Sequence, residues 1–335
     1  MAAAALVLAW VVFTVVILRR RPVAGEIHES GGILIVHASQ TGFATELASR
    51  TADMVHAGGL AVDLRAMDTL TPAMLERASR VLFIVSTTGE GDAPDMASVF
   101  RERSMRAPLA LHGVSYGILA LGDRDYDDFC AFGRDLDQWL HASGATPLFD
   151  RVEVDNGDEG ALRHWQHQVA HMSGTTAVTD WSRPAYRRWR LAERRLLNPG
   201  SVGGRCYHVA LVPEDDADLT WEAGDIAEIG PRRARGDESI MPHREYSIAS
   251  LPADGALHLV VRQMHAEDGT PGLGSGWLTA HAAVGDPIDA RIRRNAGFHA
   301  PADDRPLLLI GNGTGIAGLR ALLKARLAKG HLRNW

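Results

Sequence analysis

The stretch GGILIVHASQTGFATELASRTADMV, residues 31–55, decides the fold, because it predicts a strand, a short polar loop and a helix in immediate succession. Residues 33–37 are a short apolar run, typical of a buried parallel strand. The loop at 39–45 then supplies hydroxyls, an amide and free backbone N–H groups where a helix begins. Such a helix terminus binds anions, so the loop is a candidate phosphate site. The alternative is an ordinary N-cap of the helix.

Two further loops follow two further buried runs. RVLFIVS at 80–86 leads into TTGEGDAPDM, and SYGILAL at 115–121 leads into GDRDYDDFC. In an open doubly wound sheet, loops at the carboxyl ends of parallel strands converge on one crevice. One loop can therefore bind phosphate while the other two enclose a flat ring.

The sequences SQTGFA, STTGEGDAPD and LGDRDYDDFC resemble the three FMN-binding loops of the flavodoxin-like domain in diflavin reductases, especially the sulfite reductase flavoprotein subunit. The resemblance implies that residues 39–44 hold the FMN phosphate, that residues 86–89 line one edge of the isoalloxazine and that Tyr126 stacks on its face. Thr88 stands where several members of the family carry an aromatic residue. The FMN-binding residues that the resemblance implies are Ser39, Gln40, Thr41, Gly42, Phe43, Ala44, Ser86, Thr87, Thr88, Gly89, Leu121, Gly122, Asp123, Tyr126, Phe129 and Cys130.

Composition narrows the class of protein. The chain has 335 residues, which predicts two or three domains, and 46% of them are hydrophobic, enough for packed cores. A net charge of −6 argues against nucleic acid as the partner. The two cysteines, Cys130 and Cys206, lie far apart, and no Cys/His cluster predicts a metal site, so reduced thiols in a cytosolic compartment are expected. For Cys130, packing is favoured over redox chemistry.

The N-terminus predicts a membrane anchor. Residues 2–18 contain no charge and are followed by three arginines, Arg19, Arg20 and Arg21. The run is near the short end of the range for a membrane span, and the arginines after it place the rest of the chain in the cytoplasm. We therefore expect a single-pass membrane protein anchored by residues 1–21, with a buried core helix as the alternative.

Alternating strands and helices complete the first domain. Strands are predicted at 60–64 and 147–154, and helices at 71–78, 95–103, 129–142 and 161–172, which makes an α/β sandwich. Acidic residues surround the expected flavin edge, and they are either solvated loop carboxylates or a docking surface for a basic electron-transfer partner. They are Glu90, Asp92, Asp95, Asp123, Asp125, Asp127 and Asp128.

Prolines, glycines and an arginine cluster predict a linker over 174–204, after which the periodicity changes to short strands at 206–212, 225–229, 246–250 and 257–264. These strands predict a small antiparallel barrel. HREYSIAS and GLGSGWL resemble the FAD-binding signatures of the ferredoxin–NADP reductase module. Carried over, Arg244 contacts the FAD pyrophosphate beside Glu245, Tyr246 stacks on the flavin, Ser247 is the catalytic residue near its reactive edge, and the pyrophosphate is capped by Gly272, Leu273, Gly274 and Ser275.

PLLLIGNGTGIAGLRALL at 306–323 again predicts a strand, a glycine loop and a helix, the context of a dinucleotide site. It resembles the family's NADPH loop, which implies cofactor-binding roles for Gly311, Gly313, Thr314 and Gly315. The remaining residues of that domain in the family would lie beyond Trp335, so the NADP-binding domain is expected to be partial.

The expected fold is thus an α/β flavodoxin-like doubly wound parallel sheet, an antiparallel β-barrel FAD domain and a partial α/β NADP-binding domain, with one transmembrane helix. The expected boundaries are 1–21 for the anchor, 31–173 for the FMN domain, 174–204 for the linker, 205–302 for the FAD domain and 303–335 for the NADP domain. The resemblance implies an oxidoreductase that passes electrons from NADPH to FAD to FMN to a protein or haem acceptor. The alternative is a tethered flavodoxin-like carrier that a separate reductase reduces.

Overall fold

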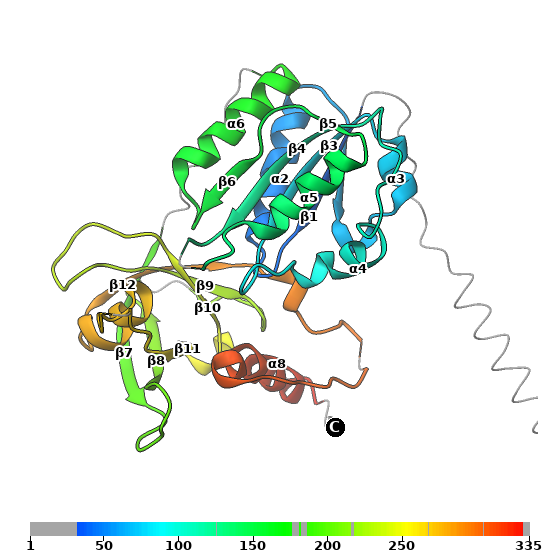
Figure 1. The fold of residues 1–335 in the computed structure, drawn as a ribbon. Helices are drawn as coiled ribbons and strands as arrows, with labels where there is room; N and C mark the ends of the chain where they lie inside the picture. The colour runs from blue at the N-terminus through cyan, green and yellow to red at the C-terminus, as the bar shows by residue number, and fades with distance from the viewer. Residues whose placement is uncertain are drawn as a thin grey trace, which may run out of the picture.

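The computed structural model describes residues 32–124, 126–175, 181, 186–215, 218–266, 268–303 and 305–330. They form two units (Figure 1): a parallel sheet covered by helices on both faces, and an antiparallel sheet with a C-terminal helix. The orange strand β12 runs along the boundary between them.

Six strands form the parallel sheet in the order β2-β1-β3-β4-β5, and β6 also pairs with β4. The strands are β1 (Ile33–Ala38), β2 (Val62–Ala66), β3 (Arg80–Ser86), β4 (Ser115–Gly122), β5 (Thr146–Pro147) and β6 (Val152–Asp155). Ile33 pairs with Val62 on one side and with Arg80 on the other. The strand order therefore reverses at β1 and β3, and the carboxyl ends of these strands open the crevice where ligands bind in such sheets.

Helices cover both faces of this sheet, as its apolar strands require. α4 (Asp95–Arg103) and α5 (Ala131–Ala142) contribute to the core that holds Leu34 and Val36, while α2 (Phe43–Ala57) and α6 (Glu159–Ser173) contribute to the core that holds Ile33 and Ile35. The short helix α3 (Pro72–Arg77) and the 3₁₀ turn η1 (Met67–Thr69) connect β2 to β3. Successive residues of β1 thus serve opposite cores, which is the period of a strand.

Two strands of the first unit differ from prediction. β2 begins two residues later than the strand expected at 60–64, and the strand expected at 147–154 is divided into β5 and β6, both paired with β4. The interruption has a packing cause. Phe149, which lies between the two pieces, sits against Gly117 of β4 and meets the Trp165 ring edge-on at 5.5 Å between centroids.

The second sheet is antiparallel, in the order β10-β9-β12-β7-β8-β11. Its strands are β7 (Arg187–Leu196), β8 (Cys206–Pro213), β9 (Ile226–Gly230), β10 (Arg244–Ser247), β11 (Leu257–Arg262) and β12 (Pro287–Arg293). The Ala249 N–H donates to the His258 carbonyl at 2.8 Å, which joins the chain beyond β10 to β11, the strand at the opposite end of the order.

The prediction of a linker over 174–204 is wrong at 187–196, where β7 is an interior strand of the second sheet. Trp189 and Leu191 are buried, whereas Arg188 and Arg190 between and beside them are exposed. The arginines that suggested a linker are therefore the solvent face of a strand with period 2. β12 was not predicted either.

Residues 305–330 of the C-terminal part contain a helix but no strand. α8 (Ile316–Ala328) follows the turn η5 (Gly313–Gly315), and it is tied to the second sheet by the ion pair of Lys324 with Asp254. The strand expected at the start of 306–323 is not formed, and Leu308 and Ile310 are 76% and 80% exposed. A strand needs a hydrogen-bonding neighbour, and this segment has none among the described residues. The remaining elements are α7 (Leu273–Gly276), the π-helical turn Trp277–His281, and the 3₁₀ turns Pro252–Asp254 and Ala296–Phe298.

The expectation of a single-pass membrane protein is corrected. Within the described residues, no helix combines the length and the apolar character needed to cross a bilayer. The proposed anchor, residues 1–21, lies outside the described residues.

Candidate functional site

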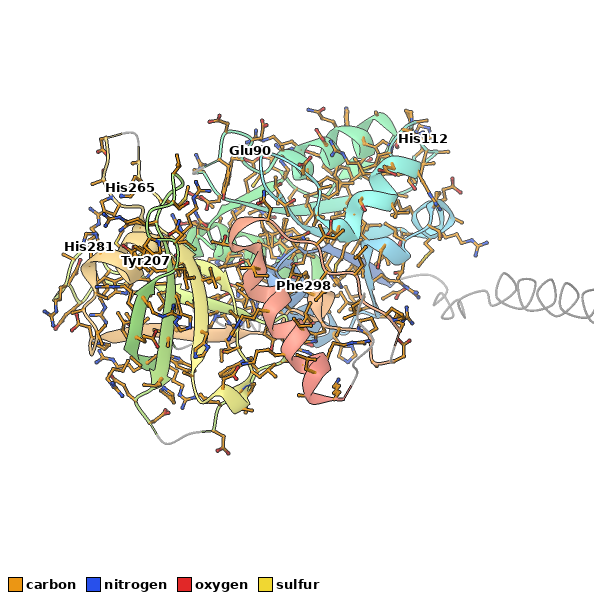
Figure 2. The ribbon with its side chains drawn as sticks, turned by 90° about the horizontal axis from the view of Figure 1, so that it is seen from below. Glu90, His112, Tyr207, His265, His281 and Phe298 are labelled. Carbon is orange, nitrogen blue, oxygen red and sulfur yellow. The ribbon has the colours of Figure 1, made fainter. Side chains whose placement is uncertain are left out.

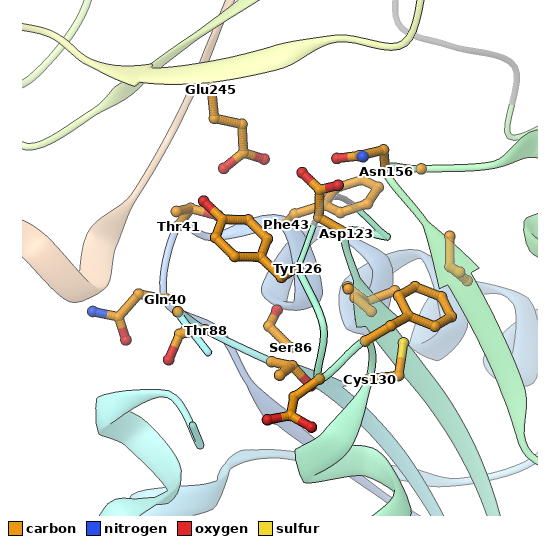
Figure 3. Close-up of a pocket in the computed structure, with 18 of the residues that line it drawn as sticks. Gln40, Thr41, Phe43, Ser86, Thr88, Asp123, Tyr126, Cys130, Asn156 and Glu245 are labelled. Atoms are coloured by element: carbon orange, nitrogen blue, oxygen red, sulfur yellow. The ribbon is translucent and has the colours of Figure 1, made fainter. Parts of the chain in front are cut away.

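A cavity of about 400 Å³ opens at the carboxyl ends of β1, β3 and β4 (Figure 3). All three predicted FMN loops contribute to its wall. The lining residues are Gln40, Thr41, Phe43, Ser86, Thr87, Thr88, Gly89, Leu121, Gly122, Asp123, Tyr126, Asp128, Phe129, Cys130, Val154, Asn156, Gly157, His243, Arg244 and Glu245. The structure therefore brings together three segments that are distant in sequence.

Ser39 shapes the first loop. Its hydroxyl accepts hydrogen bonds from the backbone N–H groups of Gly42 at 2.8 Å and Ala44 at 3.2 Å. Gly42 has φ +93°, a left-handed conformation that favours glycine. Two of the expected phosphate donors are thus engaged within the loop, while Thr41 lines the cavity with its Oγ1 3.4 Å from the Arg293 Nη2.

Gln40 fixes the first loop to the second. Its amide Nε2 donates to the Asp95 carboxylate at 3.1 Å, and its Oε1 accepts from the Asp95 backbone N–H at 3.0 Å. Asp95 opens α4, the helix that follows the second loop. Gln40 therefore positions the walls of the cavity.

The second loop carries a buried hydroxyl that has no partner. The Thr87 N–H donates to the Leu121 carbonyl at 2.9 Å, but the Thr87 Oγ1 is buried and has no hydrogen-bond partner among the described residues. A buried polar group without a hydrogen-bond partner destabilises the folded protein by about 1–3 kcal/mol. A polar ligand atom in the cavity would satisfy it, which is what a bound ring with carbonyl and N–H groups offers.

Aromatic and sulfur-containing side chains of the third loop form one side of the cavity. Tyr126 is 47% exposed at the mouth, where an aromatic ring can stack on a flat ligand. Cys130 is fully buried in the left-handed region at φ +54°, and its thiol donates to the Ala120 carbonyl at 3.4 Å. Burial, with Glu153 nearby, raises the pKa of the Cys130 thiol to about 12. The thiol therefore stays neutral and packs.

Some residues of the cavity wall were not predicted from the sequence. Asn156 and Gly157 follow β6 and close the side of the cavity, and both have positive φ. An Asn-Gly pair after a buried strand is a turn signal that could have identified them. His243 comes from the second unit, and no local signal predicts it.

Three residues of the predicted FAD site, Arg244, Tyr246 and Gly274, lie in contact with one another. A Cβ on Gly274 would lie 2.6 Å from the Arg244 Cγ and 2.8 Å from the Tyr246 hydroxyl, so only glycine fits between them. The Ser275 hydroxyl accepts from the Met264 N–H at 3.0 Å. Arg244 also lines the cavity of the first unit, so β10 serves both units.

The other two predicted sites lie around α8. Ser247 is exposed and close to Gly318 of this helix, and Phe298 lies beside the same glycine. Figure 2 shows Phe298 next to α8. Gly311, Gly313 and Gly315 are exposed, Thr314 is half-buried, and none of the four lines the cavity described above.

The acidic residues around the mouth divide into two groups. Glu90, Asp92, Asp127 and Asp128 are exposed, whereas Asp95 is bound to Gln40 and Asp123 is half-buried. Asp125 lies outside the described residues. The exposed carboxylates form a negative rim beside the cavity.

Comparison with known proteins gives consistent matches. The Flavodoxin family model matches residues 35–165. The chain is 37% identical to the sulfite reductase [NADPH] flavoprotein alpha-component of Aliivibrio fischeri over 416 aligned positions, covering 89% of this chain and 69% of that protein. The protein of the same name from Vibrio cholerae is 36% identical over 158 residues, 45% of this chain and only 26% of that protein. Among solved structures, a flavodoxin of Streptococcus pneumoniae matches with 29% identity and a TM-score of 0.38, over 42% of this chain and 97% of that one.

Proposed function

The chain belongs to the family of the sulfite reductase [NADPH] flavoprotein alpha-components, and we propose on that premise that it is an NADPH-dependent diflavin oxidoreductase. The observation that carries the proposal is the cavity of about 400 Å³ where three loops of the parallel sheet meet β10 of the second unit. The cofactors of this function are FMN, FAD and NADPH. When bound, they supply the chemistry, a hydride from NADPH to FAD and single electrons from FMN to an acceptor.

The residues around the cavity suit FMN. The Thr41 hydroxyl and the loop 39–44 hold the phosphate at the start of α2, Tyr126 covers the ring, and the Thr87 hydroxyl meets a polar atom of the ring edge. Ser86, Thr88 and Gly89 line one side of the ring. The unpartnered Thr87 hydroxyl supports this assignment, because a bound flavin removes its cost.

For FAD, we assign the second sheet as a barrel-like domain. Arg244 and the segment 272–275 hold the pyrophosphate, Tyr246 packs on the flavin side and Ser247 lies near the reactive edge. The contact of Gly274 with Arg244 and Tyr246 supports this grouping. The turn at 311–315, which opens α8, is the NADPH contact. The domains of this proposal are 31–173 for FMN, 205–302 for FAD, extended to include β7, and 303–335 for NADP.

The acceptor is a protein that docks on the negative rim of Glu90, Asp92, Asp127 and Asp128. Complementary charge raises the rate of encounter and is screened by salt. The exposure of these four carboxylates beside the cavity supports a basic docking face on the partner.

A flavin analysis tests the proposal. The purified chain is denatured, and the released flavins are separated and quantified, while NADPH oxidation is followed with ferricyanide as the acceptor. FMN and FAD in equal amounts together with NADPH turnover support the enzyme. Absence of both flavins after incubation with each would overturn it.

A carrier reduced by a separate reductase is the second candidate. It is favoured by one observation, that residues 306–310 form no strand ahead of the glycine turn at 311–315. FMN without FAD, and no NADPH oxidation, would identify the carrier.

A further inference from the structure

A carboxylate of the second unit lies on the loop that we assign to the FMN phosphate. Glu245 of β10 lines the cavity together with Thr41, and its side chain points into the cavity (Figure 3). The Arg293 guanidinium pairs with the same carboxylate, and its Nη2 lies 3.4 Å from the Thr41 Oγ1. One guanidinium nitrogen therefore contacts both the Thr41 hydroxyl and the Glu245 carboxylate.

Glu245 belongs to a compact group of charges between the two units. Arg293 pairs with Glu228 at 2.7 Å as well as with Glu245, and Arg291 pairs with Glu228 and, at 3.4 Å, with Glu46 of α2. With the pair of Arg50 and Glu46 at 2.6 Å, three carboxylates share three guanidiniums, so the group carries no net charge when His243 is neutral. The Nε2 of His243 lies 3.8 Å from Glu245.

The centre of the cluster is buried, whereas the Glu245 side chain is 26% exposed. The side chains of Glu228 and Arg293 are 2% and 3% exposed, and the Arg293 Nη1 has no hydrogen-bond partner among the described residues. Burial opposes the ionisation of Glu245, but Arg293, His243 and Thr41 together outweigh it and lower its pKa to about 2. The carboxylate thus remains an anion at every working pH.

A phosphate monoester carries about −1.5 to −2 charges at neutral pH. Placed on Thr41, it would meet the Glu245 carboxylate, and like charges repel each other. Both anions would lie beside the same hydroxyl and the same guanidinium nitrogen.

We propose that Glu245 is a built-in competitor of the FMN phosphate at Thr41, so that FMN binding and the docking of β10 on the phosphate loop oppose each other. The proposal rests on the function proposed above, in which residues 39–44 hold that phosphate. By linkage, the docked second unit lowers the affinity for FMN by the same factor by which FMN weakens docking. Riboflavin, which lacks the phosphate, escapes the competition.

The test titrates the flavin-free full chain with FMN and with riboflavin, following the quenching of flavin fluorescence. Glu245→Gln keeps the shape of the side chain and removes its charge. We expect FMN to bind about tenfold more tightly to this variant, within the usual range of coupling between sites, while riboflavin affinity is unchanged. Glu245→Asp, which withdraws the carboxylate from Thr41, should give a smaller gain in the same direction. Glu214→Gln, at an exposed glutamate next to β8, is the matched control and should change neither affinity.

Equal or weaker FMN binding by Glu245→Gln, or an equal change for FMN and riboflavin, would overturn the proposal while leaving the flavin site intact. If the wild-type chain bound neither flavin, the proposed function itself would fail. A second readout is the radius of gyration from X-ray scattering. FMN should increase it in the wild type, riboflavin should not, and the same values with both flavins would contradict the coupling.

Discussion

The Arg293 guanidinium lies over the Phe43 ring, with its central carbon 5.3 Å from the ring centroid. Arg293 ends β12 of the antiparallel sheet, and Phe43 begins α2 directly after the phosphate loop. The imidazole of His243 meets the same ring edge-on at 6.2 Å between centroids. The Phe43 ring of the parallel-sheet unit thus contacts two side chains of the other unit.

Replacing Phe43 by leucine should weaken the contact between the units. The variant Phe43→Leu keeps an apolar side chain but loses the ring face, and a cation–π contact of this kind is worth about 1 kcal/mol. We expect the free energy of unfolding to fall by about this amount in urea titrations. An unchanged midpoint would show that the stacking contributes nothing to stability.

Gly117 should not tolerate a methyl group. A Cβ at this position would lie 2.6 Å from Cζ of Phe149 in the core, so Gly117→Ala should destabilise the protein by about 1–3 kcal/mol. Gly113 has no heavy atom within 4 Å of the same position and is the matched control. Equal melting temperatures for the two alanine variants would contradict the packing.

Removing the Thr87 hydroxyl should stabilise the flavin-free protein and weaken its binding of FMN. Thr87→Val replaces a buried unpartnered hydroxyl by a methyl group, so the flavin-free protein should gain about 1 kcal/mol while its affinity for FMN falls. Thr88→Val is the comparison, because the Thr88 hydroxyl donates to the Asp92 carbonyl at 3.2 Å and its loss should bring no gain. Tighter FMN binding by Thr87→Val would rule out a hydrogen bond to the flavin.

Cys130 should resist alkylation. Because burial raises the pKa of its thiol to about 12, almost no thiolate exists at pH 8, and iodoacetamide should modify it only after unfolding. The neutral thiol therefore contributes fully to the free energy of unfolding below its ordinary pKa near 9, and this contribution is lost as the pH rises towards 12. Mass spectrometry of the alkylated protein distinguishes Cys130 from the half-buried Cys206.

The acid sensitivity of the protein should depend on Glu245. Its pKa is lowered to about 2, so its contribution to stability is complete above the ordinary value near 4.5 and is lost as the pH falls towards 2. Across this pH interval, the difference in free energy of unfolding between the wild type and Glu245→Gln should therefore shrink as the pH falls. Denaturant titrations at successive pH values measure this difference. A difference that is constant with pH would mean that the charge does not stabilise the fold.

The parallel unit was predictable because its signals are local. β3 at Arg80–Ser86 and α4 at Asp95–Arg103 begin and end where the apolar runs and turn residues predicted. The convergence of three loops followed from the rule for doubly wound sheets. β7 was not recognised, because its arginines obscured the alternation with Trp189 and Leu191, and the division into β5 and β6 depends on the packing of Phe149 against a distant glycine.

The part of the site contributed by the second unit could not be predicted from sequence. Glu245 and Arg293 are 48 residues apart. Arg293 contacts Thr41 and Arg291 pairs with Glu46, and both of these partners belong to the parallel-sheet unit. Nothing local in HREYSIAS or in PIDARIR specifies that pairing, since it depends on how two cores dock. The membrane location was predicted from an apolar run and the arginines after it, which lie outside the described residues, and no described helix has the length and apolar character needed to cross a bilayer.

Ala249 has both of its backbone groups occupied, its N–H by the His258 carbonyl and its carbonyl oxygen by the Arg320 guanidinium. An unpaired strand edge is a template on which a second chain can add, and repeated addition gives fibrils. At Ala249 a foreign strand would find neither donor nor acceptor. α8, through Arg320, thus occupies a backbone acceptor that the chain beyond β10 would otherwise offer to a second strand.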